Sequence, residues 1–131
     1  MAERPFITCH VLDTTTGKPG VGISCVLEAS DEGSSEAKPT WKGVTNNDGR
    51  VTAWDETTGH HLNEHIAERK RNLSHGDDII LTLHFGTGVY FGYENTLYPE
   101  VVILFSVKKQ EEHYHLPLLL GPWSYTTYRG S

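Results

Sequence analysis

Two histidines and one arginine in this 131-residue chain have side chains suited to acid–base chemistry. His10 and His115 lie in stretches where apolar residues alternate with others, and Arg50 directly follows an Asp-Gly pair. Imidazole titrates near neutral pH, so two histidines can divide the roles of general base and general acid. A guanidinium adds a permanent positive charge for an anion or a developing oxyanion. This combination suits hydrolysis without a metal or another cofactor.

Alternation along the strands predicts where both histidines point. In FITCHVLD (6–13) and in EEHYHLPLLL (111–120), one parity is apolar and forms the core face, so His10 and His115 lie on the opposite, outer face. Histidines on the outer face of a sheet are ordinary surface residues. The strand of His115, however, carries leucines on both parities and leads to Trp123. We therefore expect this outer face to be covered, most simply by another subunit.

Period-two alternation dominates the rest of the chain and predicts a single-domain β-sandwich rather than a βαβ fold. Asp48 and Gly49 stand between two alternating runs, which predicts a hairpin turn with Arg50 at the start of the next strand. About eight short strands are expected, with one brief helix or turn within 87–99. The strands are predicted at 6–13, 22–30, 39–45, from 50, and at 78–85, 100–108, 111–120 and 123–129.

Residues 55–76 lack alternation and are rich in charge, which predicts a solvated insert with one short helix. The insert contains His61, Glu64 and His65 in the order H-x-x-E-H. This is the inverted zinc-protease pattern, whose two histidines share a helical face. A zinc site also needs a third ligand and a larger cleft. We therefore favour a solvated helix over a metal site here.

Composition limits the classes of partner. The chain has 17 acidic and 11 basic residues, for a net charge of −6, which argues against nucleic acid. Its longest apolar runs are far shorter than a membrane span. Cys9 and Cys25 lie within apolar strands and no signal peptide is evident, so buried thiols in the cytoplasm are expected. A peroxisomal location is the alternative, although the final RGS is not an S-K-L type signal.

Three blocks of sequence carry a family resemblance: ITCHVLDTTTGKPG (7–20), TNNDGRVT (45–52) and YHLPLLLGPWSYTTYRGS (114–131). They resemble the 5-hydroxyisourate hydrolases, the transthyretin-related enzymes of urate breakdown. The resemblance covers nearly the whole chain outside 55–76. It implies that His10, Arg50 and His115 are catalytic. It also implies that a signature end contributes to substrate binding, formed by Tyr128, Arg129, Gly130 and Ser131.

The same resemblance implies a transthyretin-like, eight-stranded sandwich of two four-stranded sheets with one short helix. It further implies a homotetramer, a dimer of dimers, with active sites along a channel between subunits. The implied reaction is metal-free hydrolysis of 5-hydroxyisourate to 2-oxo-4-hydroxy-4-carboxy-5-ureidoimidazoline, and either histidine can be the base. We expect an ordered chain end, with the Ser131 carboxylate as a hydrogen-bond acceptor beside the site.

A transthyretin-like protein that binds a small ligand without hydrolysing it is the alternative. Such a carrier does not need His10, Arg50, His115 and the YRGS end together. Because a fold hosts many functions, these residues rather than the fold separate the two classes. Their joint presence favours the enzyme.

Overall fold

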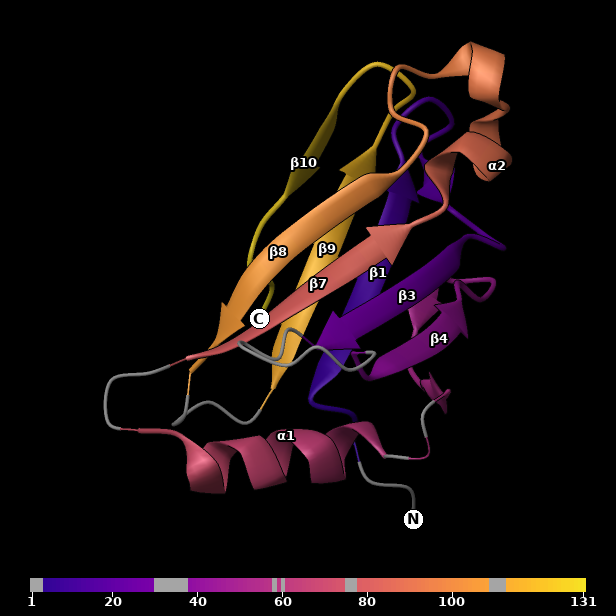
Figure 1. The fold of residues 1–131 in the computed structure, drawn as a ribbon. Helices are drawn as coiled ribbons and strands as arrows, with labels where there is room; N and C mark the ends of the chain where they lie inside the picture. Colours follow the sequence, from indigo (N-terminus) through magenta and orange to yellow (C-terminus); the bar gives the residue numbers. More distant parts are fainter. Residues whose placement is uncertain (1–3, 30–37, 58, 60, 75–77, 109–112) are drawn as a thin grey trace.

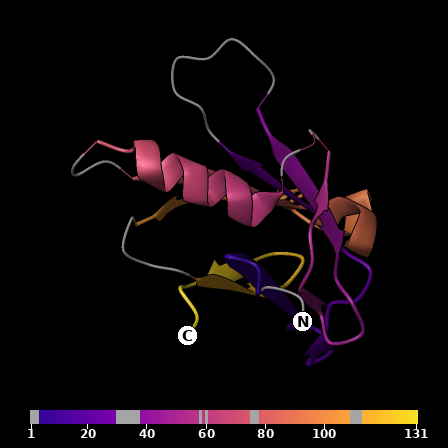
Figure 2. The same cartoon turned by 90° about the horizontal axis from the view of Figure 1, so that it is seen from below.

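Two β-sheets stack face to face around an apolar core in the computed structural model, which describes residues 4–29, 38–57, 59, 61–74, 78–108 and 113–131 (Figures 1 and 2). Sheet A contains β1 (Ile7–Asp13), β2 (Lys18–Pro19), β5 (Arg50–Val51), β9 (Tyr114–Leu120) and β10 (Tyr125–Thr127). Sheet B contains β3 (Ser24–Ala29), β4 (Thr40–Val44), β6 (Asp55–Glu56), β7 (Ile79–Phe85) and β8 (Val101–Val107). The helices are α1 (Leu62–Asn72), α2 (Thr87–Phe91) and the short 3-10 helix η1 (Tyr93–Asn95).

The two-sheet sandwich predicted from the sequence is confirmed. Sheet A has the order β10-β9-β1-β2 with β5 also paired to β1, and sheet B has the order β6-β4-β3-β7-β8. Each sheet has five strands rather than four; sheet A includes the two-residue strands β2 and β5, and sheet B includes the two-residue strand β6. Helix α1 lies within 55–76 and α2 within 87–99, the two segments in which the sequence allowed a short helix. Neither is long and apolar enough to cross a membrane, and the same holds throughout the described residues.

Alternate residues along the strands are buried in the core, as the sequence predicted. In β1 and β7, every second residue is buried and the residues between are partly exposed. The buried residues of both sheets meet in one cluster, which includes Cys9 and Cys25 as free thiols. Removing this apolar surface from water is the main stabilising contribution to such a sandwich. As a consequence, His10 lies on the outer face of sheet A.

The turn at Asp48 and Gly49 forms as predicted, but the hairpin does not. Gly49 has a φ of 75°, its amide donates to the Asn46 carbonyl at 2.9 Å, and β5 then pairs with β1 instead of β4. A Cβ at Gly49 would collide with the backbone oxygen of Val11. The turn therefore carries the chain from sheet B to sheet A, and only glycine permits this close approach. This crossing brings Arg50 beside β1.

Helix α1 lies across the end of the sandwich at which β1 begins (Figures 1 and 2). Leu62 and Ile66 are buried in the core cluster, whereas the charged residues of the helix lie toward the surface. Asn63 is also buried, and it accepts from the Phe6 amide at 2.8 Å and donates to the Arg4 carbonyl at 2.9 Å. The segment 55–76 thus has one solvated side and one docked side. Residues 58, 60 and 75–77 of it lie outside the described part.

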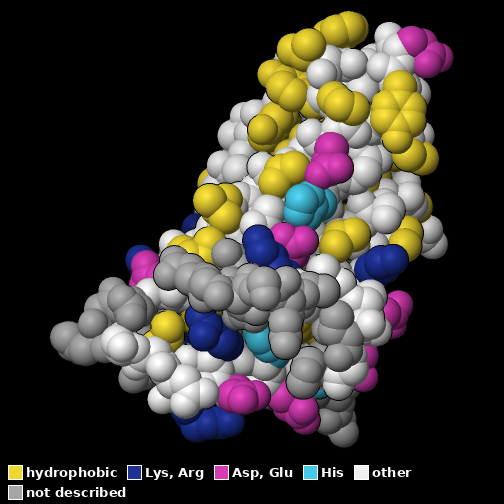
Figure 3. Space-filling view, viewed as in Figure 1, with side chains coloured by type: hydrophobic (Ala, Val, Ile, Leu, Met, Phe, Trp, Pro, Cys, Tyr) yellow, Lys and Arg dark blue, Asp and Glu magenta, His cyan; other side chains and the backbone are white. Residues whose placement is uncertain are grey.

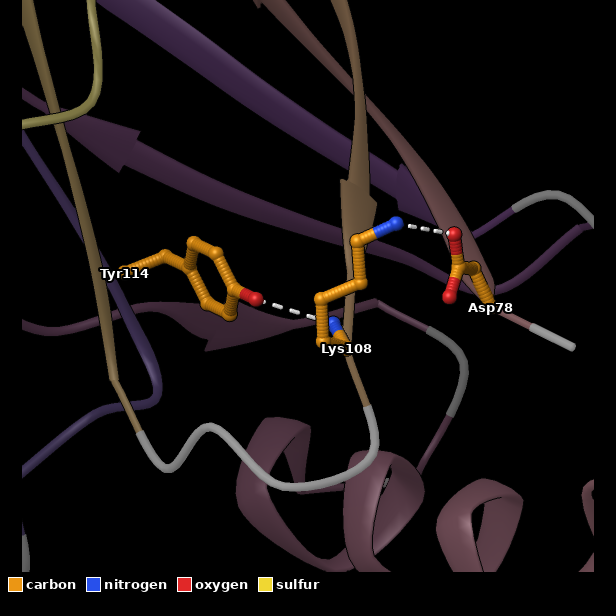
Figure 4. A network of polar contacts seen from close by, with 3 residues as sticks. All are labelled: Asp78, Lys108 and Tyr114. Carbon is orange, nitrogen blue, oxygen red and sulfur yellow. Dashed lines mark hydrogen bonds and ion pairs between the residues drawn. The ribbon is translucent and has the colours of Figure 1, made fainter. Parts of the chain in front are cut away.

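A polar network joins the start of β9 to sheet B (Figure 4). The Tyr114 hydroxyl accepts from the Lys108 amide at 2.9 Å, and the Lys108 ammonium pairs with Asp78. The Tyr114 ring makes a second contact, because the guanidinium carbon of Arg129 lies 4.7 Å from its centroid. Tyr114 therefore fixes the strand that carries His115 against both β8 and the segment after β10.

The buried carboxylate of Asp13 ties the end of β1 to α2. The Tyr90 hydroxyl donates to it at 2.7 Å and the Thr15 amide at 2.9 Å. Burial by itself would raise the pKa of Asp13, but the hydrogen bonds from Thr15 and Tyr90 together outweigh it and hold the pKa below 3.8. The carboxylate stays ionised, so these hydrogen bonds are charge-assisted.

Replacing Tyr90 by phenylalanine removes one of these hydrogen bonds. We expect the free energy of unfolding to fall by about 1.5–3 kcal/mol, measured by urea unfolding near neutral pH. The stabilisation from ionised Asp13 is present above pH 3.8 and is lost as the pH falls through its lowered folded-state pKa, so the difference from wild type should shrink there. Tyr93→Phe is the matched control, because that side chain is 64% exposed. An equal loss in both variants would contradict this role for Tyr90.

Candidate active site

Strand register brings the three predicted catalytic residues together on the outer face of sheet A. Arg50 in β5 is the direct partner of His10 in β1, and His115 in β9 is the direct partner of Thr8 in β1. The imidazole rings of His10 and His115 have centroids 6.3 Å apart and planes 29° apart. Both histidines are half-buried and Arg50 is exposed. Two imidazoles and a guanidinium are thus carried on neighbouring strands of one face.

A cavity of about 430 Å³ adjoins this cluster, which is a volume suited to a small organic molecule. Arg4, Arg50, His115 and Ser131 contribute to its wall. Its complete lining is Arg4, Pro5, Thr8, Cys9, Arg50, Thr52, His115 and Ser131. Two guanidinium groups give the cavity a positive character, which favours an anionic ligand.

Arg4 was not predicted from the sequence. Its charge is its only signal there, because nothing in the local pattern places residues before β1 next to β5 and β9. Asn63 of α1 accounts for its position, since the Asn63 side-chain amide binds the Arg4 carbonyl. The helix in the charged insert therefore contributes indirectly to the wall of the cavity.

The surroundings of His115 lower its pKa from the ordinary 6.5. Burial is the largest cause, because it disfavours the charged imidazolium. The charges of Arg50, His10, His113 and Arg4 act in the same direction. His115 is therefore neutral at physiological pH and able to accept a proton.

The signature end of the chain divides between two places. Gly130 forms an isolated β-bridge with His115, and its amide donates to the His115 carbonyl at 2.8 Å. A Cβ at Gly130 would lie 2.7 Å from the imidazole Cδ2, so glycine is required for this approach. Ser131 lines the cavity described above, whereas Tyr128 and Arg129 line a second cavity of about 390 Å³ beside Tyr114.

The residues of the inverted zinc-protease pattern lie at the start of α1. Within the part of the chain that the structure describes, no three histidine, cysteine, aspartate or glutamate side chains come together as ligands. His65 instead packs against the buried Trp41, with ring centroids 5.2 Å apart. His61 is the residue preceding α1 and has no side-chain cap hydrogen bond there. His65 therefore contributes to the packing of α1 against β4.

Comparison with known proteins gives a family match over nearly the whole chain. The sequence profile described as the HIUase/Transthyretin family matches residues 7–130. The chain is 36% identical to the 5-hydroxyisourate hydrolase of Salmonella typhimurium over 133 residues, which cover 99% of this chain and 84% of that protein.

Solved structures agree with the fold. The 5-hydroxyisourate hydrolase of Klebsiella pneumoniae matches with a TM-score of 0.61 and 28% identity, over 95% of this chain and 92% of that one. Sea bream transthyretin in complex with thyroxine matches with a TM-score of 0.69 over 95% of this chain and 94% of that one. At 19% identity, the second likeness concerns the fold alone.

Replacing Arg50 by glutamine tests the electrostatics of His115. Loss of a nearby cation should raise the pKa of His115, yet leave it below 6.5 because burial is the larger cause. The measurement is an NMR titration of the His115 ring. Arg71→Gln is the matched control, since Arg71 is an exposed residue of α1 and is not among the charges that act on His115. A pKa that moves down in Arg50→Gln, or moves equally in both variants, would refute this account.

Proposed function

The chain belongs to the HIUase/Transthyretin family, and we propose that it hydrolyses 5-hydroxyisourate to 2-oxo-4-hydroxy-4-carboxy-5-ureidoimidazoline in the breakdown of urate. The observation that carries this proposal is that Arg50 and His115 line one cavity on the outer face of sheet A, while His10 lies next to both, as the strand partner of Arg50 and with its ring centroid 6.3 Å from that of His115. These groups supply a base, an acid and a fixed positive charge. No metal or cofactor is needed for such a hydrolysis.

In the proposed reaction, water attacks a ring amide carbonyl of the substrate. His115 is the general base, because its lowered pKa keeps it neutral, and it takes a proton from the water as the oxygen adds to the carbonyl carbon. The carbon–nitrogen bond of the ring then breaks, and His10 donates a proton to the departing nitrogen. Arg50 and Arg4 hold the substrate oxygens and stabilise the negative charge that develops there.

A transthyretin-like carrier without hydrolase activity is not favoured. A carrier has no use for two imidazoles 6.3 Å apart with a guanidinium paired opposite one of them. Relatives from Salmonella dublin and Mus musculus, at 36% and 32% identity, bear the name 5-hydroxyisourate hydrolase, and one from Schizosaccharomyces pombe, at 35% identity, is named a probable 5-hydroxyisourate hydrolase. A carrier would be the conclusion only if the protein failed to accelerate hydrolysis in the assay described below.

We also propose that the protein assembles as a homotetramer, a dimer of dimers. Among the described strands, β8 and β10 stand at the edges of the two sheets. Leu104 on β8 is 69% exposed and Trp123 beside β10 is 65% exposed. Figure 3 shows further apolar side chains gathered at the end of the molecule where α2 lies. Open sheet edges and exposed apolar side chains of this kind favour an oligomer, in which further copies of the chain bury them.

The cytoplasm is the proposed site of action. Both cysteines, Cys9 and Cys25, are buried free thiols, which is the usual state of cysteine in a reducing compartment. Their place in the core, on strands of opposite sheets, serves packing rather than chemistry.

The decisive assay follows the loss of 5-hydroxyisourate absorbance after urate oxidase has generated the compound. Nanomolar wild-type protein should accelerate this loss, and His10→Ala or His115→Ala should reduce kcat/KM by about 100-fold or more. His84→Ala is the control, because His84 lies on sheet B, where its ring pairs with Glu100. Circular dichroism checks that all variants fold. A wild-type protein without effect on the decay would overturn the proposal in favour of a carrier.

Gly130→Ala tests whether the signature end holds the site together. The added Cβ must displace the His115 ring or the backbone beside it, so we expect kcat/KM to fall by about 10- to 100-fold. Gly86→Ala is the matched control, since a Cβ there meets only ordinary contacts with Ser24, at 3.5 Å and beyond. Equal activity of Gly130→Ala and wild type would remove Gly130 from the site.

A further inference from the structure

A chain of hydrogen bonds leads from a backbone carbonyl to the catalytic ring of His115. Nδ1 of His113 lies 2.8 Å from the carbonyl oxygen of Pro5. Nε2 of the same ring lies 3.3 Å from Oγ1 of Thr8, and this hydroxyl lies 2.8 Å from Nδ1 of His115. One hydroxyl thus stands between two imidazoles, on the side of His115 away from Nε2.

The chemistry of these groups fixes the direction of the hydrogen bonds. A carbonyl only accepts, so Nδ1 of His113 carries the proton in its contact with Pro5. In neutral His113, Nε2 can then only accept, and the Thr8 hydroxyl donates its one proton to it. The Thr8 oxygen is left to accept from Nδ1 of His115. Nδ1 of His115 therefore holds its proton, and Nε2 carries the free lone pair.

We propose that Thr8 and His113 are positioning residues that hold neutral His115 in the Nδ1–H tautomer, so that Nε2 is the base. This role rests on the proposed function only where it concerns the rate of hydrolysis. The tautomer itself follows from the hydrogen bonds of the free protein. A general base needs its lone pair on the nitrogen that faces the reaction, so a ring in the other tautomer is idle.

Only one change of protonation reverses the chain. If both nitrogens of His113 carried protons, Nε2 would donate to Thr8, and Thr8 would donate to Nδ1 of His115. His115 would then hold its proton on Nε2 and act as an acid. The other charged or titratable groups around His115 are Arg50 on β5, His10 on β1 and Arg4 before β1. None of these three is hydrogen-bonded to the Thr8 hydroxyl in the described contacts, so the direction is set by His113.

Paired strands position two of the three side chains in this chain of hydrogen bonds. Thr8 and His115 are direct partners on the parallel strands β1 and β9, while His113 immediately precedes β9. Thr8 and both histidines are half-buried. Positioning by neighbouring strands at the centre of a sheet is more exact than positioning by a loop.

The first test is a direct measurement of the tautomer in the wild-type protein. Long-range ¹H–¹⁵N correlation of ¹⁵N-histidine-labelled protein at mildly alkaline pH distinguishes a protonated from an unprotonated ring nitrogen. We expect the His115 signals to show the proton on Nδ1. A proton mainly on Nε2 would overturn the proposal without any variant being needed.

The second test removes either member of the chain. Thr8→Val deletes the acceptor for Nδ1–H, and His113→Phe frees the Thr8 proton to bind Nδ1, so both should shift His115 toward the Nε2–H tautomer. Thr8→Ser keeps the hydroxyl and should retain the wild-type tautomer. Thr82→Val is the matched control, since Thr82 lies on β7 of sheet B and has no described side-chain hydrogen bond. An unchanged tautomer in both Thr8→Val and His113→Phe would refute the positioning role.

The kinetic readout is separate from the spectroscopic one. In Thr8→Val and His113→Phe we expect kcat to fall about 10-fold with little change in KM, a part of the roughly 100- to 10,000-fold that a general base supplies. Thr8→Ser should restore kcat. A fall in Thr8→Ser equal to that in Thr8→Val would contradict the role of the hydroxyl. If wild-type protein left 5-hydroxyisourate untouched while His115 showed the Nδ1–H tautomer, the proposed function would fail and the positioning role would stand.

Discussion

The parallel pairing of β1 with β9 is the constraint on which the rest of the site depends. The two strands run in register from Ile7 opposite Tyr114 to Asp13 opposite Leu120. Because their side chains alternate in phase, Thr8, His10 and His115 all fall on the outer face of sheet A. The glycine turn before β5 then adds Arg50 at the other edge of β1. A shift of one residue in this register would send His115 into the core and the adjacent tyrosine out of it.

Several structural features maintain that register from outside sheet A. The Tyr114 hydroxyl joins β9 to Lys108, the residue after β8, and the Asp13 carboxylate joins the opposite end of β1 to Tyr90 of α2. Asn63 of α1 binds the backbone just before β1. Each contact lies outside the cavity, yet each fixes a strand that carries a residue of the site. The fold is shared with a transthyretin at 19% identity, so the function is argued from the side chains held on that face and not from the fold.

The local features of this structure were accessible from the sequence, and the contacts between distant segments were not. Period-two alternation predicted the outward position of His10 and His115 before any pairing was known. The Asp48-Gly49 turn was also predicted, but the pairing of the strand after it was predicted wrongly. Turn chemistry sets the local bend and not the sheet that the chain joins next. Arg4 and the hydrogen bonds of Thr8 with His113 needed the β1–β9 pairing, which no local pattern encodes. The burial of Asn63 could not be predicted either, because in a charged segment the sequence does not distinguish a buried amide from a solvated one.

The separation of β1 and β9 along the chain also has a consequence for synthesis. Thr8 and His115 are 107 residues apart, so a ribosome adding roughly 5–20 residues per second makes β9 about 5–20 s after β1. During that interval, the edge of β1 that pairs with β9 lacks its neighbouring strand. Such long-range pairing makes folding slow and leaves strand edges open to other chains. Until β9 is made, the edge of β1 therefore stays open to pairing with other chains.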